Sequence, residues 1–199
     1  MPARSVPTLD DEFVSLVHDD PGAALTRLDG SPSLALAAAS WGETALEAAS
    51  HLGNRRLLAA FFEAGAVPDI FAACAMGDMR AVEGLLPFTR PHALGVHRLP
   101  LLHFAVVSRD PAMLDVLLDA GVVLNPRGAS LSPLHSAVAV GSVPMIRALV
   151  EAGVDRSVTD AFGATALDWA YDVEDKGSIL AVMLSGYLRR ATEDLPTAG

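Results

Sequence analysis

Hydrophobic and polar residues follow a helical pattern through much of the chain, and residues 132–153 show it most clearly. In "SPLHSAVAVGSVPMIRALVEAG" a short apolar run ends at Gly141, and apolar residues then recur at positions i, i+3 and i+4. Such residues share one face of an α-helix, and glycine commonly follows a helix C-terminus. The stretch therefore predicts two short helices, one over about 133–140 and one that begins after Ser142 and ends before Gly153.

The same pattern recurs along the chain with a period close to 33 residues. The segment 100–121 aligns with 132–153, so that His103 stands over His135 and both segments end on glycine. Four further segments fit the frame with other residues at the histidine position. The aligned positions are Phe13, Glu47, Phe71, His103, His135 and Asp168, separated by 34, 24, 32, 32 and 33 residues. Self-similarity at such a period is typical of repeat proteins.

Each predicted unit consists of two helices that are too short to be stable alone. Isolated helices below about 12 residues are marginal in water, so stacking of neighbouring units must supply the buried apolar surface. The composition agrees, because alanine and leucine dominate and aromatic residues make up only 6%. The predicted fold class is all-α, a solenoid of stacked helix-turn-helix units.

The units resemble ankyrin repeats. The features that carry the resemblance are the period, the glycines that follow the helices, and "SPLH" at Ser132–His135, which is similar to the Thr-Pro-Leu-His motif of that family. The resemblance covers about residues 11–188. It implies that short β-hairpin fingers, the loops that precede the first helix of each unit, link the helical hairpins.

We expect a single ankyrin-repeat domain over residues 11–188, between a flexible N-terminus (1–10) and a flexible C-terminal tail (189–199). Its units are predicted at about 11–36, 40–68, 69–95, 96–127, 128–160 and 161–188. Because so few residues separate Gly65 from Phe71, the sequence predicts a tight turn and no finger at residues 66–70. Pro100 stands where the motif has a hydroxyl, so the first helix of the fourth unit is expected to lack that cap.

Ser132 and His135 raise the question of a nucleophile and its base, because a helix brings residues three apart together. A nucleophile also needs an orienting group and an oxyanion site in the same cleft. Other units keep the histidine without the hydroxyl, or the hydroxyl without the histidine. We therefore interpret these residues as parts of a repeated scaffold. The scaffold positions are Thr44, Ser132, Pro133, His103, His135, Thr165, Gly65, Gly121 and Gly153.

Other candidate chemistry is sparse, and we expect no catalytic residue, no metal ligand and no cofactor. His92 and His97 lie five apart in a predicted loop, but no cysteine or carboxylate stands beside them at ligand spacing. Zinc needs three or four protein ligands. Cys74 is the one cysteine, so an intramolecular disulfide is excluded, and we expect its thiol to be buried and inert.

The resemblance implies a binding surface on the concave side, formed by the finger tips and by the ends of the first helices. Carried over to this sequence, these positions are unusually apolar, and contiguous exposed apolar surface normally marks an interaction site. Large side chains carry most of the binding energy at interfaces. The expected protein-binding residues are Trp41, His51, Leu52, Met76, His97, Leu99, Val107, Leu131, Val140 and Phe162.

Charge and composition narrow the expected partners. The formal net charge is −10 and Lys176 is the sole lysine, so neither nucleic acid nor a membrane surface is an expected partner. No apolar segment has the length of a signal peptide or a transmembrane helix, and we expect a cytoplasmic protein. The excess of arginine over lysine, together with the alanine content, suggests a GC-rich bacterial genome.

The function that the resemblance implies is non-catalytic protein–protein interaction. We expect an adaptor or regulator that binds an unidentified protein partner on its concave, largely apolar face, and that is itself a monomer or a weak homodimer. Two alternatives stay open. One is a self-associating structural protein, and the other is a small hydrolase that uses Ser132 and His135.

Overall fold

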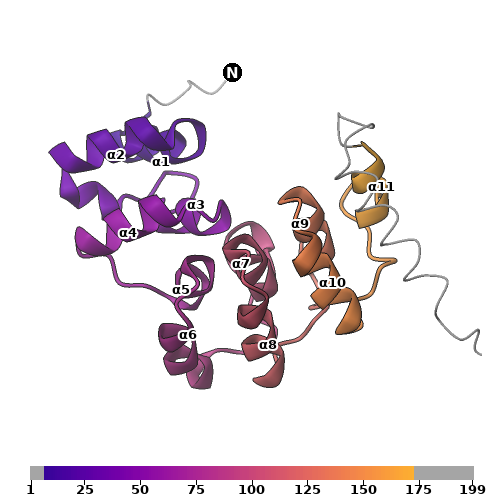
Figure 1. Cartoon of the computed structure of the whole chain (residues 1–199). Helices are drawn as coiled ribbons and strands as arrows, with labels where there is room; N and C mark the ends of the chain where they lie inside the picture. The colour runs from indigo at the N-terminus through magenta and orange to yellow at the C-terminus, as the bar shows by residue number, and fades with distance from the viewer. Residues whose placement is uncertain (1–6, 173–199) are drawn as a thin grey trace, which may run out of the picture. The chain divides into compact units, whose positions relative to one another are not determined.

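The computed structural model describes residues 7–172, which form helices joined by turns and loops (Figure 1). Within this range there is no β-strand, only isolated β-bridges. The described chain divides between Thr89 and Arg90 into two compact units, the first over residues 7–89 and the second over residues 90–172. The helices are α1 (Leu9–Asp19), α2 (Pro21–Gly30), η1 (Pro32–Leu36), α3 (Ala45–His51), α4 (Arg55–Glu63), α5 (Ile70–Met76), α6 (Met79–Leu85), η2 (Leu86–Phe88), η3 (Val96–Arg98), α7 (Leu101–Ser108), α8 (Pro111–Asp119), α9 (Pro133–Ala139), α10 (Val143–Glu151) and α11 (Ala166–Asp172).

Polar residues begin nearly all of the α-helices. The first N–H groups of a helix have no partner inside it, and a side-chain oxygen just before the helix can accept from them. Such N-cap bonds are made by Thr8, Asp20, Thr44, Asn54, Asp69, Asp78, Asp110, Ser132, Ser142 and Thr165. Helix α7 is the exception, because Pro100 stands at its N-cap and makes no side-chain bond. The missing cap predicted for the fourth repeat is therefore confirmed.

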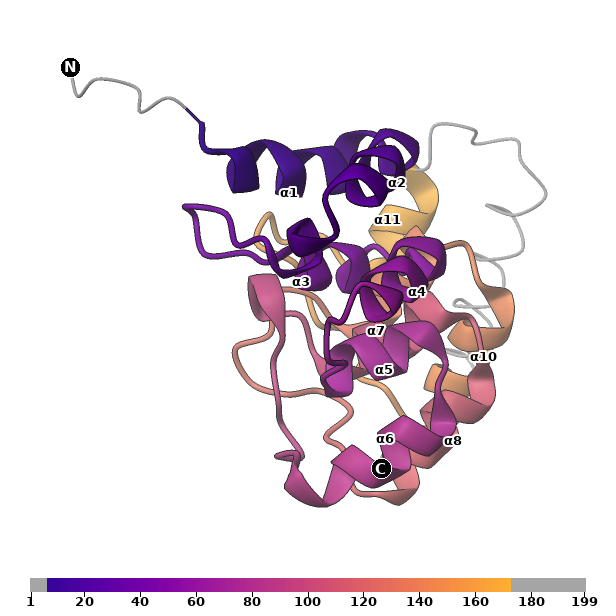
Figure 2. The same cartoon turned by 90° about the vertical axis from the view of Figure 1, so that its left-hand side faces the viewer.

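In the first unit three helical hairpins, α1–α2, α3–α4 and α5–α6, follow one another (Figures 1 and 2). Helix α3 packs against α1 on one side and α5 on the other, and α2 contacts α4. Phe13 and Phe61 lie fully buried between these hairpins, with ring centroids 6.2 Å apart. Burying a side chain of this size contributes about 1.5–3 kcal/mol, which is how helices this short become stable.

In the second unit α7–α8 and α9–α10 form hairpins, and α11 packs against α9. The buried side chains between them include Phe104, Leu114 and Ile146. A buried polar contact also joins the first helices, because Nδ1 of His103 in α7 lies 2.8 Å from Oγ of Ser136 in α9. The two hairpins are therefore held by apolar burial and by a hydrogen bond between neighbouring repeats.

Three fingers are closed by an antiparallel bridge at their base. The bridged pairs are Ala38 with Thr44, Leu94 with Pro100, and Thr159 with Thr165. The loop of the fifth repeat, 126–132, has no such bridge. Ala45 and Leu101 donate their N–H groups to carbonyl oxygens across the first two fingers, at 2.9 and 3.3 Å. Pro133 stands at the equivalent position and has no N–H to donate, so its finger lacks this bond.

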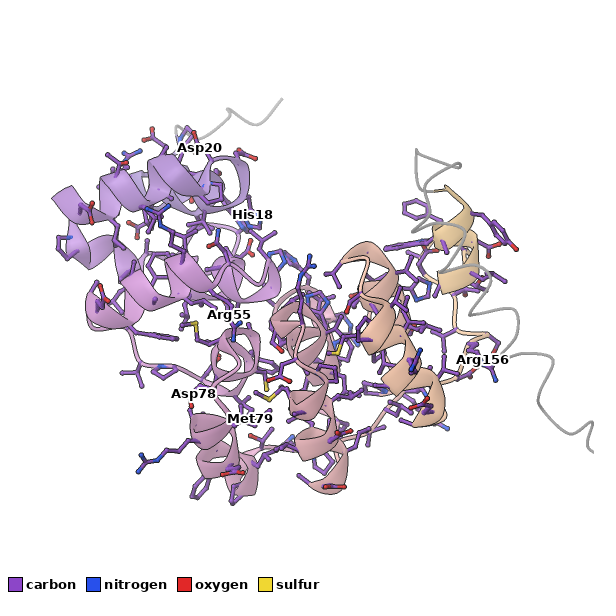
Figure 3. The ribbon with its side chains drawn as sticks, in the orientation of Figure 1. His18, Asp20, Arg55, Asp78, Met79 and Arg156 are labelled. Carbon is purple, nitrogen blue, oxygen red and sulfur yellow. The ribbon has the colours of Figure 1, made fainter. Side chains whose placement is uncertain are left out.

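No bridge closes the connection between α4 and α5, as the short spacing at residues 66–70 predicts. Arg55 at the start of α4 joins the two elements instead (Figure 3). Its Nε donates to the carbonyl oxygen of Met76 at 2.8 Å, and its Nη2 donates to the same oxygen. The C-terminal end of α5 thus receives the partner that helix carbonyls otherwise lack.

The predicted all-α repeat fold is confirmed. The two helices expected over 133–140 and between Ser142 and Gly153 are α9 and α10, each within about one residue of its expected end. None of the helices in residues 7–172 has the length and apolar content needed to cross a membrane. The proposed limits of the repeat domain stay a prediction, and its C-terminal part lies outside the described residues.

Candidate functional site

Trp41, His97 and Phe162 occupy equivalent positions at the tips of the three bridged fingers, each three residues after the first bridging residue. Trp41 is 53% exposed, Phe162 is 94% exposed, and His97 is also exposed. Aromatic side chains bury 150–250 Å² each when a partner covers them. These three predicted binding residues therefore lie where a partner can reach them.

Phe162 is presented on a turn that the carboxylate of Asp160 organises. Oδ1 accepts hydrogen bonds from the backbone N–H groups of Phe162 and Ala164, both at 2.9 Å, and Oδ2 accepts from Nε1 of Trp169 at 2.9 Å. The bond from Ala164 makes the largest contribution to lowering the pKa of Asp160 below its ordinary value. The carboxylate is therefore ionised at neutral pH, and the turn is held in one conformation before any partner binds.

The finger that carries Trp41 is fixed to the first helix by Asp11. Oδ1 of Asp11 accepts from the N–H of Ser40 at 2.6 Å, and Oδ2 accepts from the N–H of Thr8 at 2.8 Å. These two backbone bonds lower the pKa of Asp11 to about 2, and the bond from Ser40 makes the larger contribution. The finger tip is thus tied to the N-terminal end of α1 by a charged, buried side chain.

The bridged finger between Leu94 and Pro100 has an unusual backbone. His97 and Arg98 have positive φ angles of 54° and 57°, a conformation that costs a residue with a side chain roughly 1–2 kcal/mol. Arg98 compensates through bonds to the next repeat, because its Nε donates to the carbonyl oxygen of Gly128 at 2.7 Å and its own carbonyl accepts from Ser130 at 3.1 Å. These bonds fix the backbone next to His97, whose side chain is exposed.

The other predicted binding residues differ in exposure. Leu52 at the end of α3 is 44% exposed. Partly exposed are His51, Met76, Leu131 and Val140. Leu99 and Val107 are only 6% and 8% exposed, because Leu99 lies in the stem of its finger and Val107 belongs to a helix whose residues are all buried. The expectation that Leu99 and Val107 present apolar surface to a partner does not match this burial.

Ser132 and His135 form a buried hydrogen-bond chain at the start of α9. Oγ of Ser132 lies 2.8 Å from Nδ1 of His135, and Nε2 of His135 lies 3.0 Å from the carbonyl oxygen of Ala164. A carbonyl oxygen only accepts, so Nε2 carries the proton and Nδ1 accepts from the hydroxyl of Ser132. The ring of His135 also packs edge-to-face against the ring of Trp169, with the ring centroids 5.1 Å apart.

This chain supports the structural interpretation of Ser132 and His135. They are 3% and 0% exposed, so the hydroxyl has no open cleft in which to meet a substrate. Two other repeats have an acidic residue at the position of His135. Glu47 accepts from the N–H of Thr44 at 2.8 Å, and Asp168 accepts from that of Thr165 at 2.8 Å, which closes a capping box in each case.

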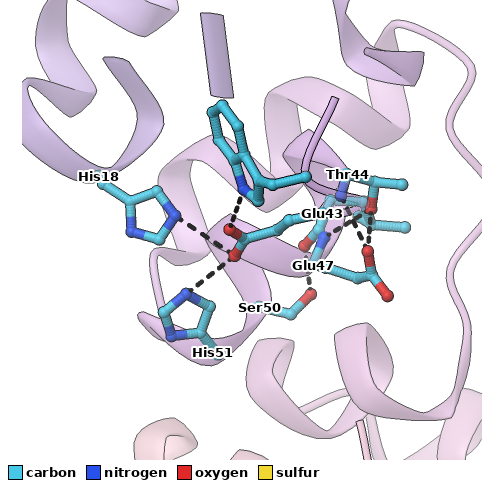
Figure 4. Close-up of polar contacts among 8 residues, drawn as sticks. His18, Glu43, Thr44, Glu47, Ser50 and His51 are labelled. Atoms are coloured by element: carbon cyan, nitrogen blue, oxygen red, sulfur yellow. Dashed lines mark hydrogen bonds and ion pairs between the residues drawn. The ribbon is translucent and has the colours of Figure 1, made fainter. Parts of the chain in front are cut away.

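A separate polar cluster lies in the first compact unit and contains His18, Glu43 and His51 (Figure 4). Nε2 of each histidine lies 3.3 Å from Oε1 of Glu43. The sequence prediction placed His51 on the binding face and left His18 out. The sequence does contain a signal for this pair, because the two histidines stand 33 residues apart, which is one repeat period. Helices α1 and α3, which carry them, pack together.

Cys74 is fully buried in α5. Burial, with a smaller contribution from the charge of Asp69, raises the pKa of the thiol to about 12. A thiol with this pKa stays protonated at neutral pH and is a poor nucleophile. The prediction that Cys74 is buried is confirmed, and the inertness of its thiol stays a prediction.

Comparisons with known proteins agree with the repeat pattern. The ankyrin-repeat family model matches residues 131–161. Zygote-specific protein 3 from Chlamydomonas reinhardtii is 32% identical over 83 residues, which cover 42% of this chain and 22% of that protein. The match thus spans about a fifth of the length of this relative. The resemblance to ankyrin repeats is confirmed, and repeats of this family generally mediate protein–protein interactions and are typically non-catalytic.

Proposed function

Because the chain carries an ankyrin repeat, we propose that it is a cytoplasmic adaptor or regulator that binds a protein partner and catalyses no reaction of its own. In this proposal each compact unit offers the finger side of its own repeats to a partner. The exposed residues expected to contribute most are Trp41 and Leu52 in the first unit and Phe162 in the second.

The observation that carries the proposal is the exposure of Phe162. An aromatic side chain that is 94% exposed gains nothing from packing within its own chain. Yet the turn beneath it is fixed by three hydrogen bonds to Asp160. A rigidly presented apolar side chain loses little conformational entropy on binding, which favours affinity.

The chemistry around the tips indicates the kind of partner. Acidic side chains lie beside two of the finger tips, Asp11 and Glu12 near Trp41 and Asp160 near Phe162. The chain carries a net charge of −10. Complementary charge speeds association and excludes wrong partners. The partner is therefore expected to offer an apolar pocket with a basic rim.

Affinity capture with a matched pair of variants tests the proposal. Phe162→Ala removes the finger tip, whereas Phe88→Ala removes an equally exposed phenylalanine (88%) that lies on no finger. Neither change removes buried packing, so both variants should fold like the wild type. A partner purified by capture should bind the Phe162 variant roughly 30-fold more weakly, since an interface anchor contributes about 2 kcal/mol.

The binding constants decide the outcome. Equal loss in both variants would mean that any exposed phenylalanine produces the effect, and the assignment to the fingers would fail. Unchanged binding by Phe162→Ala, by Trp41→Ala and by Leu52→Glu would remove the finger side from the proposal altogether.

A further inference from the structure

His18, Glu43 and His51 come from three elements of the first unit that meet at one point (Figure 4). His18 lies in the last turn of α1, His51 is the last residue of α3, and Glu43 ends the finger that leads into α3. Among residues 7–172, this is the one group of three metal-binding side chains whose ligand atoms converge. The cluster involves no residue of the second unit.

The carboxylate of Glu43 is oriented by a neighbour outside the cluster. Its side chain is only 4% exposed, and Oε2 accepts a hydrogen bond from Nε1 of Trp41 at 3.1 Å. This bond leaves Oε1 directed at the two imidazoles. Metal-binding carboxylates and histidines usually have such an outer partner, which fixes the direction of the ligand atom.

The distances fit a tetrahedral metal ion. Zinc binds histidine nitrogen and carboxylate oxygen at about 2.0–2.2 Å, so two ligand atoms of a tetrahedral site lie roughly 3.3 Å apart. Both histidine nitrogens lie 3.3 Å from Oε1 of Glu43. All three ligand atoms lie within 4.8 Å of one another, so the two histidine nitrogens need to approach by at most about 1.5 Å.

We propose that His18, Glu43 and His51 bind one zinc ion and leave a fourth coordination position open to water. The side chain of His18 is 29% exposed, which provides access for the ion and the water. Imidazole and carboxylate together suit zinc better than magnesium or calcium, which prefer oxygen ligands alone. The bound ion would join α1, α3 and the finger of Trp41, and so stabilise the first unit.

Zinc titration of the full-length chain, freed of metal with a chelator, tests this site. We expect one zinc ion per chain, and each of His18→Gln and His51→Gln should weaken its binding by about 100-fold or more. Trp41→Phe removes only the outer hydrogen bond and should weaken binding by about 10-fold. The control is the double variant His92→Ala, His97→Ala, which removes two exposed histidines and should bind zinc like the wild type.

Two further measurements keep the result decisive if a variant folds poorly. Histidine side-chain NMR of the wild type should show zinc-dependent shifts for His18 and His51 and for none of the other four histidines. Zinc should also raise the melting temperature of the wild type and of the control. Failure of the wild type to bind zinc, or binding that moves only the signals of His92 and His97, would overturn the proposal.

Discussion

Replacing Ser132 by alanine tests whether this serine serves stability, as the buried hydrogen-bond chain indicates. The substitution removes two interactions at once. The hydroxyl no longer caps α9 by accepting from the N–H of His135, and it no longer donates to Nδ1 of that histidine. Because His135 is fully buried, no water replaces the lost donor.

The expected cost of Ser132→Ala follows from these two losses. Removing an N-cap costs about 1 kcal/mol, and leaving a buried acceptor without a partner costs about 1–3 kcal/mol. We therefore expect the free energy of unfolding to fall by about 2–4 kcal/mol. Ser142 provides a matched control, because it caps α10 through a bond of 3.5 Å from Met145 and contacts no histidine. Ser142→Ala should cost only about 1 kcal/mol or less.

A third variant separates the hydroxyl from the shape of the residue. Ser132→Thr keeps the hydroxyl, and threonine already fills this position at Thr44, whose backbone angles are similar. We expect Ser132→Thr to lower the free energy of unfolding less than Ser132→Ala does, because it keeps the hydroxyl that caps α9 and donates to His135. Restored stability in this variant would assign the loss in the alanine variant to the hydrogen bonds.

Urea unfolding monitored by tryptophan fluorescence gives the required local measurement. The chain has two tryptophans, and Trp169 lies directly against His135, so a Trp41→Phe background makes the fluorescence report on this site alone. The local probe matters because repeat proteins do not always unfold in one step. If Ser132→Ala is no more destabilising than Ser142→Ala, the reasoning is refuted. Hydrolase activity that disappears in a stable Ser132→Ala protein would instead favour a nucleophile.

Three other features give predictions of their own. Arg109 has a φ of 61°, and glycine, which adopts such an angle without strain, stands at the equivalent position 141 one repeat later. Arg109→Gly should therefore raise the free energy of unfolding, measured with urea, by about 0.5–1 kcal/mol. The pKa of Asp11 in the folded protein is about 2, below its value of about 3.9 in unfolded chains, so its contribution to stability is fully present above pH of about 4 and is lost as the pH falls toward 2. Melting temperatures across this range should show a shallower acid dependence in Asp11→Asn than in the wild type. Burial raises the pKa of Cys74 to about 12, so iodoacetamide at pH 8 should label it only in urea, and mass spectrometry of labelled native protein would contradict this if it showed alkylation.

Local signals explain why the helices could be predicted from the sequence. The two helices of the fifth repeat are set by Ser132, Pro133, Gly141 and Ser142, which act within a few residues of themselves. The missing cap at Pro100 is of the same kind, because proline has no side-chain oxygen. Such features need no knowledge of the rest of the chain.

Exposure could not be predicted in the same way, because it depends on what packs above a residue. Val107 is buried although Ala139, one repeat later, is exposed, and Leu99 is buried although Leu131 and Ala164 at its position are partly exposed. Phe162 stands at a finger tip and is almost fully exposed. The repeat pattern assigns Leu99, Val107 and Phe162 to the same side and contains no information on the depth of each side chain.

The repeat period does predict which side chains meet across neighbouring units. His103 bonds Ser136 at a separation of 33 residues, and His18 and His51 converge at the same separation. Backbone groups follow a similar interval, since the N–H of Ser130 donates to the carbonyl oxygen of Arg98, 32 residues before it. Stacked repeats place each residue beside its equivalent in the next unit, so contacts that are distant in sequence become regular. Polar residues one period apart in adjacent first helices are therefore the pairs to examine for buried hydrogen bonds and metal sites, and the histidines at 18 and 51 satisfy that condition.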